Sequence, residues 1–333
     1  MKKNERDTFG TAFFGTSKLA TFVLDELEKT GIIPDVVVTV PDSRAGRGLE
    51  RRIPEAKTWA VEREIPVIQP ASLKGGDPAE DIFLNTNWRL FIVADYGNLI
   101  PKRMLDIPYA GTLNVHPSLL PKFRGPSPII SQILSDEKEV GVTIMLMDAE
   151  MDHGPIVAQA SVAPDPWPLP ASMLGEILMR EGGKLLAEVI PRWSEESMKT
   201  SELYEMDDGG GSRRATTLGF SRTEYRQENL GVFFEDAPPK LVPEPQDHAK
   251  ATYTKKVTKE DGLLDLSTDG YQNYLKYCAF DEWPGTFFFV EKKGAKRRVR
   301  ITDAAYKDGA FVIKRVVPEG KKEMDYVDFL RGA

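Results

Sequence analysis

Strand-like apolar segments alternate with helical segments through the first third of the sequence, and this alternation constrains the fold more than any other feature. Helices are predicted at Lys18–Lys29, where Ser17 is a suitable N-cap, and at Glu55–Arg63. Strands are predicted at Thr8–Phe14, Val36–Val40, Pro66–Ile68 and Leu90–Ala94. Strands and helices that alternate in this way form a doubly wound, mostly parallel sheet. The sequence therefore predicts an α/β domain over residues 1–194.

A second, smaller domain is predicted at the C-terminal end. Before it, residues 195–246 include the run Asp207-Asp208-Gly209-Gly210-Gly211-Ser212 and several prolines, a composition typical of an extended linker. Within 1–194, further helices are predicted at Pro126–Leu134 and Ala171–Trp193, and strands at Gly141–Met147 and Pro155–Val162. Short strands at Phe287–Val290, Arg297–Ile301 and Phe311–Val317 predict a β-rich domain over residues 247–333.

Composition excludes several classes of protein. No apolar run approaches the roughly 20 residues that span a bilayer, and the charged N-terminus has no signal-peptide core, so a cytoplasmic protein is expected. A single cysteine, Cys278, excludes an internal disulfide, and three scattered histidines make a metal site an unfavoured prediction. The net charge of −7 argues against a surface positive throughout, but a local basic patch could still bind nucleic acid.

The stretch from Asn114 to Gly125 contains the first candidate catalytic residues. It follows an apolar run, so Asn114 and His116 stand where a strand gives way to a loop, the edge at which open α/β sheets bind ligands. Two residues apart on a strand, both side chains point to the same face. An amide beside an imidazole can hold a developing oxyanion. On these residues alone, a capping asparagine and a half-buried structural histidine explain the pattern equally well.

A second polar segment, Met147 to Pro155, holds three carboxylates. Asp148 ends a strand and can cap the turn, and Glu150 is expected to be solvated. Asp152 precedes His153-Gly154-Pro155, a tight turn that would aim its side chain toward the ligand edge of the sheet. Asp152 is therefore a candidate for a site at that edge.

The first motif, Asn-Val-His-Pro-Ser-Leu-Leu-Pro followed by Arg124-Gly125, resembles the signature of the folate-dependent formyltransferases. The resemblance extends over roughly residues 8–193 and 251–332. It implies that Asn114, His116 and Asp152 form the catalytic site, that 10-formyltetrahydrofolate is the co-substrate and formyl donor, and that no metal is needed. The implied reaction is attack of an amine on the formyl carbon, with Asn114 and His116 stabilising the oxyanion and Asp152 accepting a proton.

The resemblance also implies a folate pocket. The segment from Val93 to Pro101 is similar to the one that lines this pocket in the family, although Asp95 stands where a small or apolar residue is usual. Taken alone, the segment would be an ordinary loop after a strand. The implied pocket residues are Tyr96, Asn98 and Ile100 on one side, and Ser118, Leu119, Leu120 and Pro121 on the other.

Two basic regions indicate the formyl acceptor. The long loop with Arg44 and Arg47 resembles the one that separates family members acting on methionyl-tRNA from their purine-pathway relatives, and residues 251–332 resemble the C-terminal domain of those members, a small barrel of the oligonucleotide-binding kind. The loop with Arg44 and Arg47 could instead be a solvated surface loop, but the second domain argues against that alternative. Residues implied to contact tRNA phosphates in the second domain are Lys292, Lys293, Lys296, Arg297 and Arg298.

The resemblance thus implies an enzyme that formylates initiator methionyl-tRNA for translation initiation, expected to be a monomer. Two rivals remain open. One is a folate-dependent formyltransferase that acts on a small amine such as a nucleotide-linked sugar. The other is an RNA-binding relative that keeps the fold without turnover.

Overall fold

The structure is a computed structural model that describes residues 10–45, 50–205, 241–292 and 294–332. The chain divides into two compact units. The first comprises residues 1–121, 141–160 and 178–250, and the second comprises residues 122–140, 161–177 and 251–333. In this division, residues 122–140 and 161–177 of the predicted α/β domain group with the C-terminal residues.

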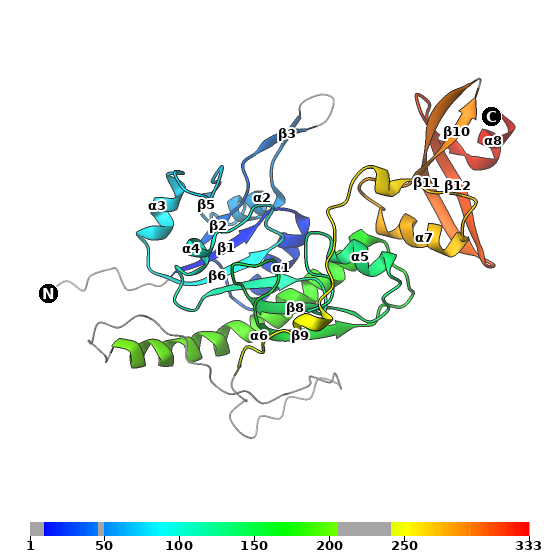
Figure 1. The fold of residues 1–333 in the computed structure, drawn as a ribbon. Coiled ribbons are helices and arrows are strands. Elements are labelled where there is room, and N and C mark those ends of the chain that lie inside the picture. The colour runs from blue at the N-terminus through cyan, green and yellow to red at the C-terminus, as the bar shows by residue number, and fades with distance from the viewer. Residues whose placement is uncertain (1–9, 46–49, 206–240, 293, 333) are drawn as a thin grey trace. The chain divides into compact units, whose positions relative to one another are not determined.

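A seven-stranded sheet forms the centre of the first unit (Figure 1). Its order is β5-β2-β1-β6-β7-β8-β9, with parallel pairing from β5 to β7 and antiparallel pairing between β7 and β8. The predicted doubly wound, mostly parallel sheet is confirmed. The strands are β1 (Gly10–Gly15), β2 (Val36–Val38), β5 (Val67–Ile68), β6 (Trp88–Ala94), β7 (Thr112–His116), β8 (Val140–Leu146) and β9 (Ile156–Val162).

The direction of winding reverses between β1 and β6. From β1 the chain passes to β2 and β5 on one side, and β6 then continues to β7 on the other. In open α/β sheets such a reversal leaves a crevice outside the carboxyl ends of the strands. The loops that follow β1, β6 and β7 therefore begin at the edge of the sheet where a ligand is expected.

Helices of this unit agree with the sequence in part. Helix α1 (Lys18–Lys29) has the predicted bounds, and Ser17 caps it by accepting a hydrogen bond from the backbone N–H of Leu19 at 3.1 Å. Helix α6 (Ala171–Glu205) contains Pro191 and continues beyond the predicted end at Trp193 into the predicted linker. The remaining helices are α2 (Glu55–Val61), α3 (Ala79–Leu84) and α4 (Lys102–Leu105), of which only α2 was predicted. No helix of the described residues is both long and apolar enough to cross a membrane.

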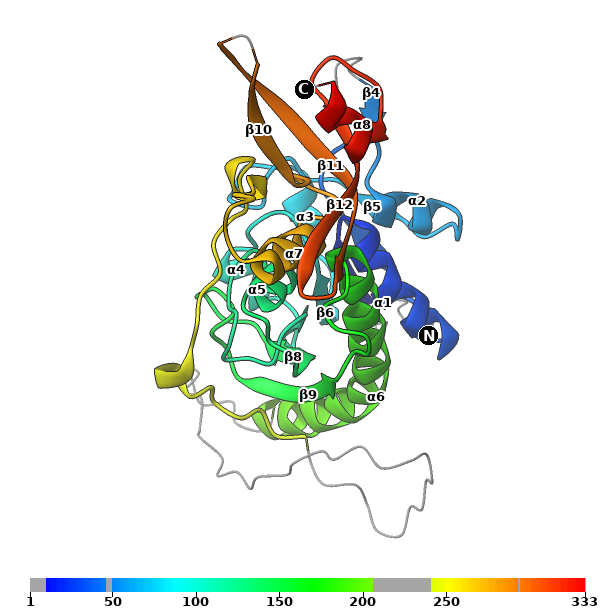
Figure 2. The ribbon, with the colours of Figure 1, turned by 90° about the vertical axis from the view of Figure 1, so that its right-hand side faces the viewer.

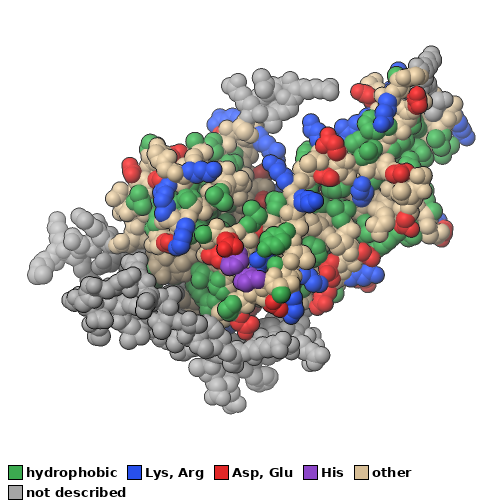
Figure 3. All heavy atoms as spheres, in the orientation of Figure 1, with side chains coloured by type: hydrophobic (Ala, Val, Ile, Leu, Met, Phe, Trp, Pro, Cys, Tyr) green, Lys and Arg blue, Asp and Glu red, His purple; other side chains and the backbone are tan. Residues whose placement is uncertain are grey.

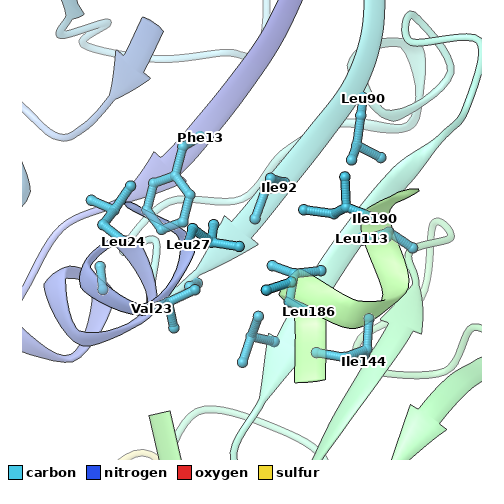
Figure 4. Close-up of a cluster of buried hydrophobic side chains, with 14 of the residues drawn as sticks. Phe13, Val23, Leu24, Leu27, Leu90, Ile92, Leu113, Ile144, Leu186 and Ile190 are labelled. Atoms are coloured by element: carbon cyan, nitrogen blue, oxygen red, sulfur yellow. The ribbon is translucent and has the colours of Figure 1, made fainter. Parts of the chain in front are cut away.

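Apolar side chains cover both faces of the sheet. One cluster joins strand residues such as Phe13 and Leu113 to Leu24 of α1 and Leu186 of α6 (Figure 4). A second cluster, on the opposite side of β1 and β6, contains Phe14 and Phe91 with α3 and α4. Each Å² of apolar area removed from water stabilises the fold by roughly 25 cal/mol. Because both faces of the sheet are buried, the strands and the loops at their ends are held in place.

The predicted long loop after β2 contains two short antiparallel strands, β3 (Ser43–Ala45) and β4 (Glu50–Arg52). Asp42 anchors the base of this hairpin by accepting hydrogen bonds from Gln69, Lys57 and Arg51 at 2.6–3.1 Å. Hydrogen bonds from Gln69 and Lys57 hold the pKa of the Asp42 carboxyl well below its usual range. The base therefore stays ion-paired at physiological pH.

The second unit contains a four-stranded antiparallel sheet of order β10-β11-β12-β13, which confirms a β-rich C-terminal domain. Its core contains Phe288, Val299, Ile301, Val316 and Phe329. The elements are α5 (Pro128–Leu134), a 3-10 turn at Glu260–Gly262, α7 (Gly270–Ala279), β10 (Phe287–Lys292), β11 (Ala295–Lys307), β12 (Ala310–Pro318), β13 (Met324–Asp325) and α8 (Tyr326–Arg331) (Figures 1 and 2).

Within this unit the segment after residue 250 pairs with the loop that follows the first motif. Arg124 and Tyr253 form a parallel bridge, in which the Arg124 N–H donates to Thr252 O at 2.8 Å and the Thr254 N–H donates to Arg124 O at 2.7 Å. Arg124 is only 1% exposed, and a Cβ on Gly125 would meet Thr254 Oγ1 at 2.8 Å. The Arg-Gly pair therefore serves close packing against residues 252–254.

Candidate active site

Strand β7 presents the two predicted oxyanion donors on one face. Leu113 and Val115 point into the apolar cluster, so the alternating residues Asn114 and His116 face the other side. Asn114 is 8% exposed and His116 is 4% exposed. Polar groups withdrawn from water to this extent interact more strongly with charge than the same groups would in solvent.

The turn between β8 and β9 brings a carboxylate to the same place. His116 Nδ1 lies 3.7 Å from Asp152 Oδ1, and the Asp152 side chain is 15% exposed. This separation is an electrostatic contact that is slightly too long for a good hydrogen bond. Asp152 has φ +49°, in the left-handed region that costs most residues energy, so the surrounding turn must impose its conformation. The structure thus brings His116 and Asp152 together, beside Asn114 on β7.

Neighbouring residues of that turn have structural roles. Asp148 Oδ1 accepts from the Glu150 N–H at 2.9 Å, and its Oδ2 lies 2.6 Å from His153 Nδ1. The Glu150 side chain is 75% exposed. Asp148 therefore shapes the turn, Glu150 is solvated, and His153 binds Asp148. Histidine side chains lie close together beside acidic residues on the face shown in Figure 3.

Gly154 closes the turn and admits no side chain. A Cβ there would lie 1.9 Å from Leu146 O and 3.3 Å from Asp148 N. Its backbone φ is not in the left-handed region, so the requirement for glycine is steric. The close approach fixes the path of the chain immediately after Asp152.

The loop after β7 is held by two residues that the sequence did not indicate. Thr143 Oγ1 on β8 donates to Ser118 O at 2.6 Å and accepts from the Leu120 N–H at 3.1 Å. Gln159 Nε2 on β9 donates to Leu120 O at 2.9 Å and to Thr143 Oγ1 at 2.8 Å. Ser118 and Leu120 are buried, whereas Leu119 and Pro121 are partly exposed. This side of the predicted folate pocket is therefore a braced loop.

The loop after β6 supplies the other predicted side. Ile100 is 7% exposed within the second apolar cluster, and Asn98 is exposed. The Tyr96 hydroxyl is buried near the Asn98 side chain, and burial raises the pKa of Tyr96, so the hydroxyl stays protonated. A neutral hydroxyl at this loop can donate a hydrogen bond to a polar ring edge such as a pterin presents. Asp95, with φ +48°, accepts a hydrogen bond from Ser17 Oγ and so joins this loop to the start of α1.

Basic residues of the second unit lie on both faces of the β10–β11 hairpin. Cα pairing puts Arg300 opposite Phe287 and Arg298 opposite Phe289, on one face. The Arg298 guanidinium lies 3.7 Å from the Phe287 ring centre, and Lys296 Nζ lies 4.5 Å from that of Phe289. Arg297 pairs with Val290 and belongs to the opposite face. We call Phe287, Phe289, Lys296, Arg298 and Arg300 the basic aromatic face. Arg300 was not among the predicted tRNA contacts.

For the other predicted tRNA contacts, the structure describes at most the position of the residue in a strand. Arg44 lies in β3, where its Cα pairs with Arg51, and Lys292 is the last residue of β10. Arg47 and Lys293 lie outside the described residues. Within the described part of the chain, no group of three or more His, Cys, Asp or Glu side chains could hold a metal ion.

Comparisons with known proteins give a consistent family. Residues 11–190 match the family described as Formyl transferase. A methionyl-tRNA formyltransferase of Chloroflexus aurantiacus is 34% identical over 305 residues, covering 92% of this chain and 83% of the relative. Another, from Thermus thermophilus, is 33% identical over 316 residues, covering 93% and 85%.

Solved structures share the fold. A 4-N formyltransferase from Francisella tularensis has a TM-score of 0.55 and 16% identity, covering 86% of this chain and 95% of that one. Methionyl-tRNA formyltransferase from Clostridium thermocellum has a TM-score of 0.50 and 15% identity, covering 96% and 100%. Because their sequence identities to this chain are similarly low, these structures do not separate one formyl acceptor from another.

Proposed function

Since the chain belongs to the methionyl-tRNA formyltransferase family, we propose that Asn114, His116 and Asp152 catalyse transfer of the formyl group of 10-formyltetrahydrofolate to the amino group of initiator methionyl-tRNA. The observation that carries the assignment is the approach of Asp152 to His116, both largely buried, at the carboxyl edge of β7. Within this proposal the enzyme works in the cytoplasm as a monomer.

The reaction begins when the neutral amine attacks the formyl carbon. A bond forms from the amine nitrogen to carbon, and the carbonyl oxygen becomes an oxyanion. Asn114 and His116 donate hydrogen bonds to that oxygen, each contributing about 3–4 kcal/mol in sites of this kind. Asp152 accepts the proton that the amine loses, directly or through a water. The bond from carbon to N10 of the folate then breaks, the carbonyl re-forms, and N10 takes up a proton.

An α-amine has a pKa near ~8, so part of it is already neutral at physiological pH. A strong base is therefore not required, and a carboxylate suffices to take the proton. Orientation of two large substrates supplies much of the remaining acceleration, because a well-placed pair avoids the entropy cost of a bimolecular encounter. The braced loop at residues 118–120 and the Tyr96 hydroxyl support a fixed folate position.

The basic aromatic face is proposed to hold tRNA phosphates, together with Arg44, Arg47, Lys292, Lys293 and the opposite-face Arg297. The aromatic rings beneath Arg298 and Lys296 support these side chains, so less conformational entropy is lost when phosphate binds. Contacts of this kind fix position without reading sequence.

The direct test is to mix the protein with methionyl-tRNA and 10-formyltetrahydrofolate and to measure N-formylmethionine after hydrolysis of the ester. We expect formylation that depends on both substrates. Formylation of a nucleotide-linked amino sugar but not of methionyl-tRNA would favour the small-amine alternative. Binding of tRNA without turnover would favour the non-catalytic one.

Charge removal on the basic aromatic face should weaken tRNA binding without affecting chemistry. We expect Lys296→Gln with Arg298→Gln to raise the KM for methionyl-tRNA about tenfold and to leave kcat within about twofold. The slope of log affinity against log salt concentration should fall by about one for each phosphate that is no longer neutralised. Filter binding over a range of salt concentrations measures this. Arg300→Gln tests the additional residue of the face. If all these variants bind tRNA like the wild type, the face is not used.

A further inference from the structure

The last residues of the predicted linker and the few residues after it are built into the first unit. Leu241 packs against the apolar cluster, and Glu244 forms an antiparallel bridge with Ile156 at the start of β9, with hydrogen bonds of 2.8 Å in both directions. Figures 1 and 2 show this segment running alongside β9. We call residues 241–250 the return segment.

Gln246 of the return segment contacts the turn between β8 and β9 through its amide nitrogen. We call this turn, residues 147–155, the catalytic turn. The residue is 5% exposed, and its Nε2 donates to Asp152 O at 2.9 Å and to Gly154 O at 2.7 Å. One side-chain amide thus uses both N–H groups on the two backbone carbonyls that flank His153. A buried carbonyl that loses such a donor has to move toward another partner or remain unsatisfied.

A second contact reaches the same turn. The His248 ring stacks on the His153 ring with 4.2 Å between centroids and 3° between planes. His248 begins a short 3-10 turn at His248–Lys250. Residues 152, 153 and 154 are therefore each touched by the return segment, two through the backbone and one through its side chain.

We propose that Gln246 is a positioning residue for Asp152, holding the backbone on both sides of His153 so that the Asp152 carboxylate faces His116. The inference rests on the proposed function. Asp152 has an unfavourable backbone conformation, and its turn has no regular secondary structure. Gln246 supplies an external constraint on this turn, and a misplacement of about 1 Å at a catalytic group can lower a rate by 10²-fold.

The variants are Gln246→Leu, which keeps volume and removes both donors, and Gln246→Glu, which keeps a polar side chain and replaces the donating nitrogen by oxygen. We expect kcat for formylation to fall by about 10- to 100-fold, with both KM values within about threefold of wild type. Gln132 gives a matched control, because it is also buried and its Nε2 donates to a backbone carbonyl, Pro128 O, at 3.1 Å within α5. Gln132→Leu should lower Tm but leave kcat near the wild-type value.

A double-variant cycle separates positioning from general loss of structure. If Gln246 acts through Asp152, Gln246→Leu should cost little more once Asp152→Asn is present, whereas independent effects would multiply. Unchanged kcat in both Gln246 variants, or losses that multiply with Asp152→Asn, would overturn the inference. The proposed function fails separately, if the wild-type protein does not formylate methionyl-tRNA or if Asp152→Asn retains full activity.

Discussion

Replacing His116 with alanine should lower kcat for formyl transfer by about 10²–10³-fold while leaving the affinity for methionyl-tRNA nearly unchanged. His116 is buried on β7 beside Asp152, so under the proposed mechanism the substitution removes a hydrogen-bond donor to the oxyanion from a position largely closed to water. The same donor contributes less when the substrate is merely bound, because the carbonyl oxygen then carries little charge. Single-turnover measurement with saturating substrates gives the chemical step directly.

The Asn114→Ala variant should lose a similar factor, and Asp152→Asn tests the charge with little change of shape. Asn273 gives a matched control for the asparagine, because it is 4% exposed and its Nδ2 donates to Asp265 O at 2.8 Å in the second unit. Asn273→Ala should reduce Tm and preserve kcat at saturation. Full activity in Asn114→Ala or His116→Ala would remove them from the catalytic assignment.

The Gly154→Ala variant is expected to lose about 10²-fold in kcat without altering any group that touches substrate. Its Cβ would lie 1.9 Å from Leu146 O, so the backbone of the turn has to move by more than an ångström to admit a methyl group. Leu146 cannot easily yield, because its N–H donates to Pro155 O at 2.9 Å where β8 and β9 meet. Displacement of the turn moves Asp152 away from His116 and also lowers Tm.

Gly332 gives a control in which the added methyl has room. A Cβ there would be 3.6 Å from Asp328 O, its nearest neighbour among the described residues, which is an ordinary contact. Gly332→Ala should therefore leave kcat and Tm near wild type. If Gly154→Ala were equally active, the position of the turn would not limit catalysis.

Sequence patterns correctly predicted those features of the fold that depend on interactions between residues close together in the chain. The bounds of α1 and its Ser17 cap follow from helical periodicity and one hydrogen bond. The common face of Asn114 and His116 follows from the two-residue repeat of a strand. The approach of Asp152 to His116 is a contact between distant residues, and it was expected only from the turn composition together with the family resemblance.

Features that depend on tertiary contacts were missed. Thr143 and Gln159 look like ordinary polar positions on two strands, and only the pairing of β8 with its neighbours turns them toward residues 118–120. The basic run at residues 292–300 gave no strand register, so it could not separate Arg298 from Arg297. Gln246 lies in a proline-rich stretch whose composition is typical of a linker, and that composition concealed its contact with the catalytic turn.

The return segment has a consequence for dissecting this enzyme by cleavage. A fragment ending at residue 193 would retain all three proposed catalytic side chains but lack the amide that donates to Asp152 O and Gly154 O. A fragment ending at residue 250 would recover that amide and still lack Thr252 and Thr254, which hydrogen-bond to Arg124. Slow turnover by a truncated protein could therefore come from a displaced Asp152 as well as from weaker tRNA binding. Point substitutions in the intact chain are needed to separate these two causes.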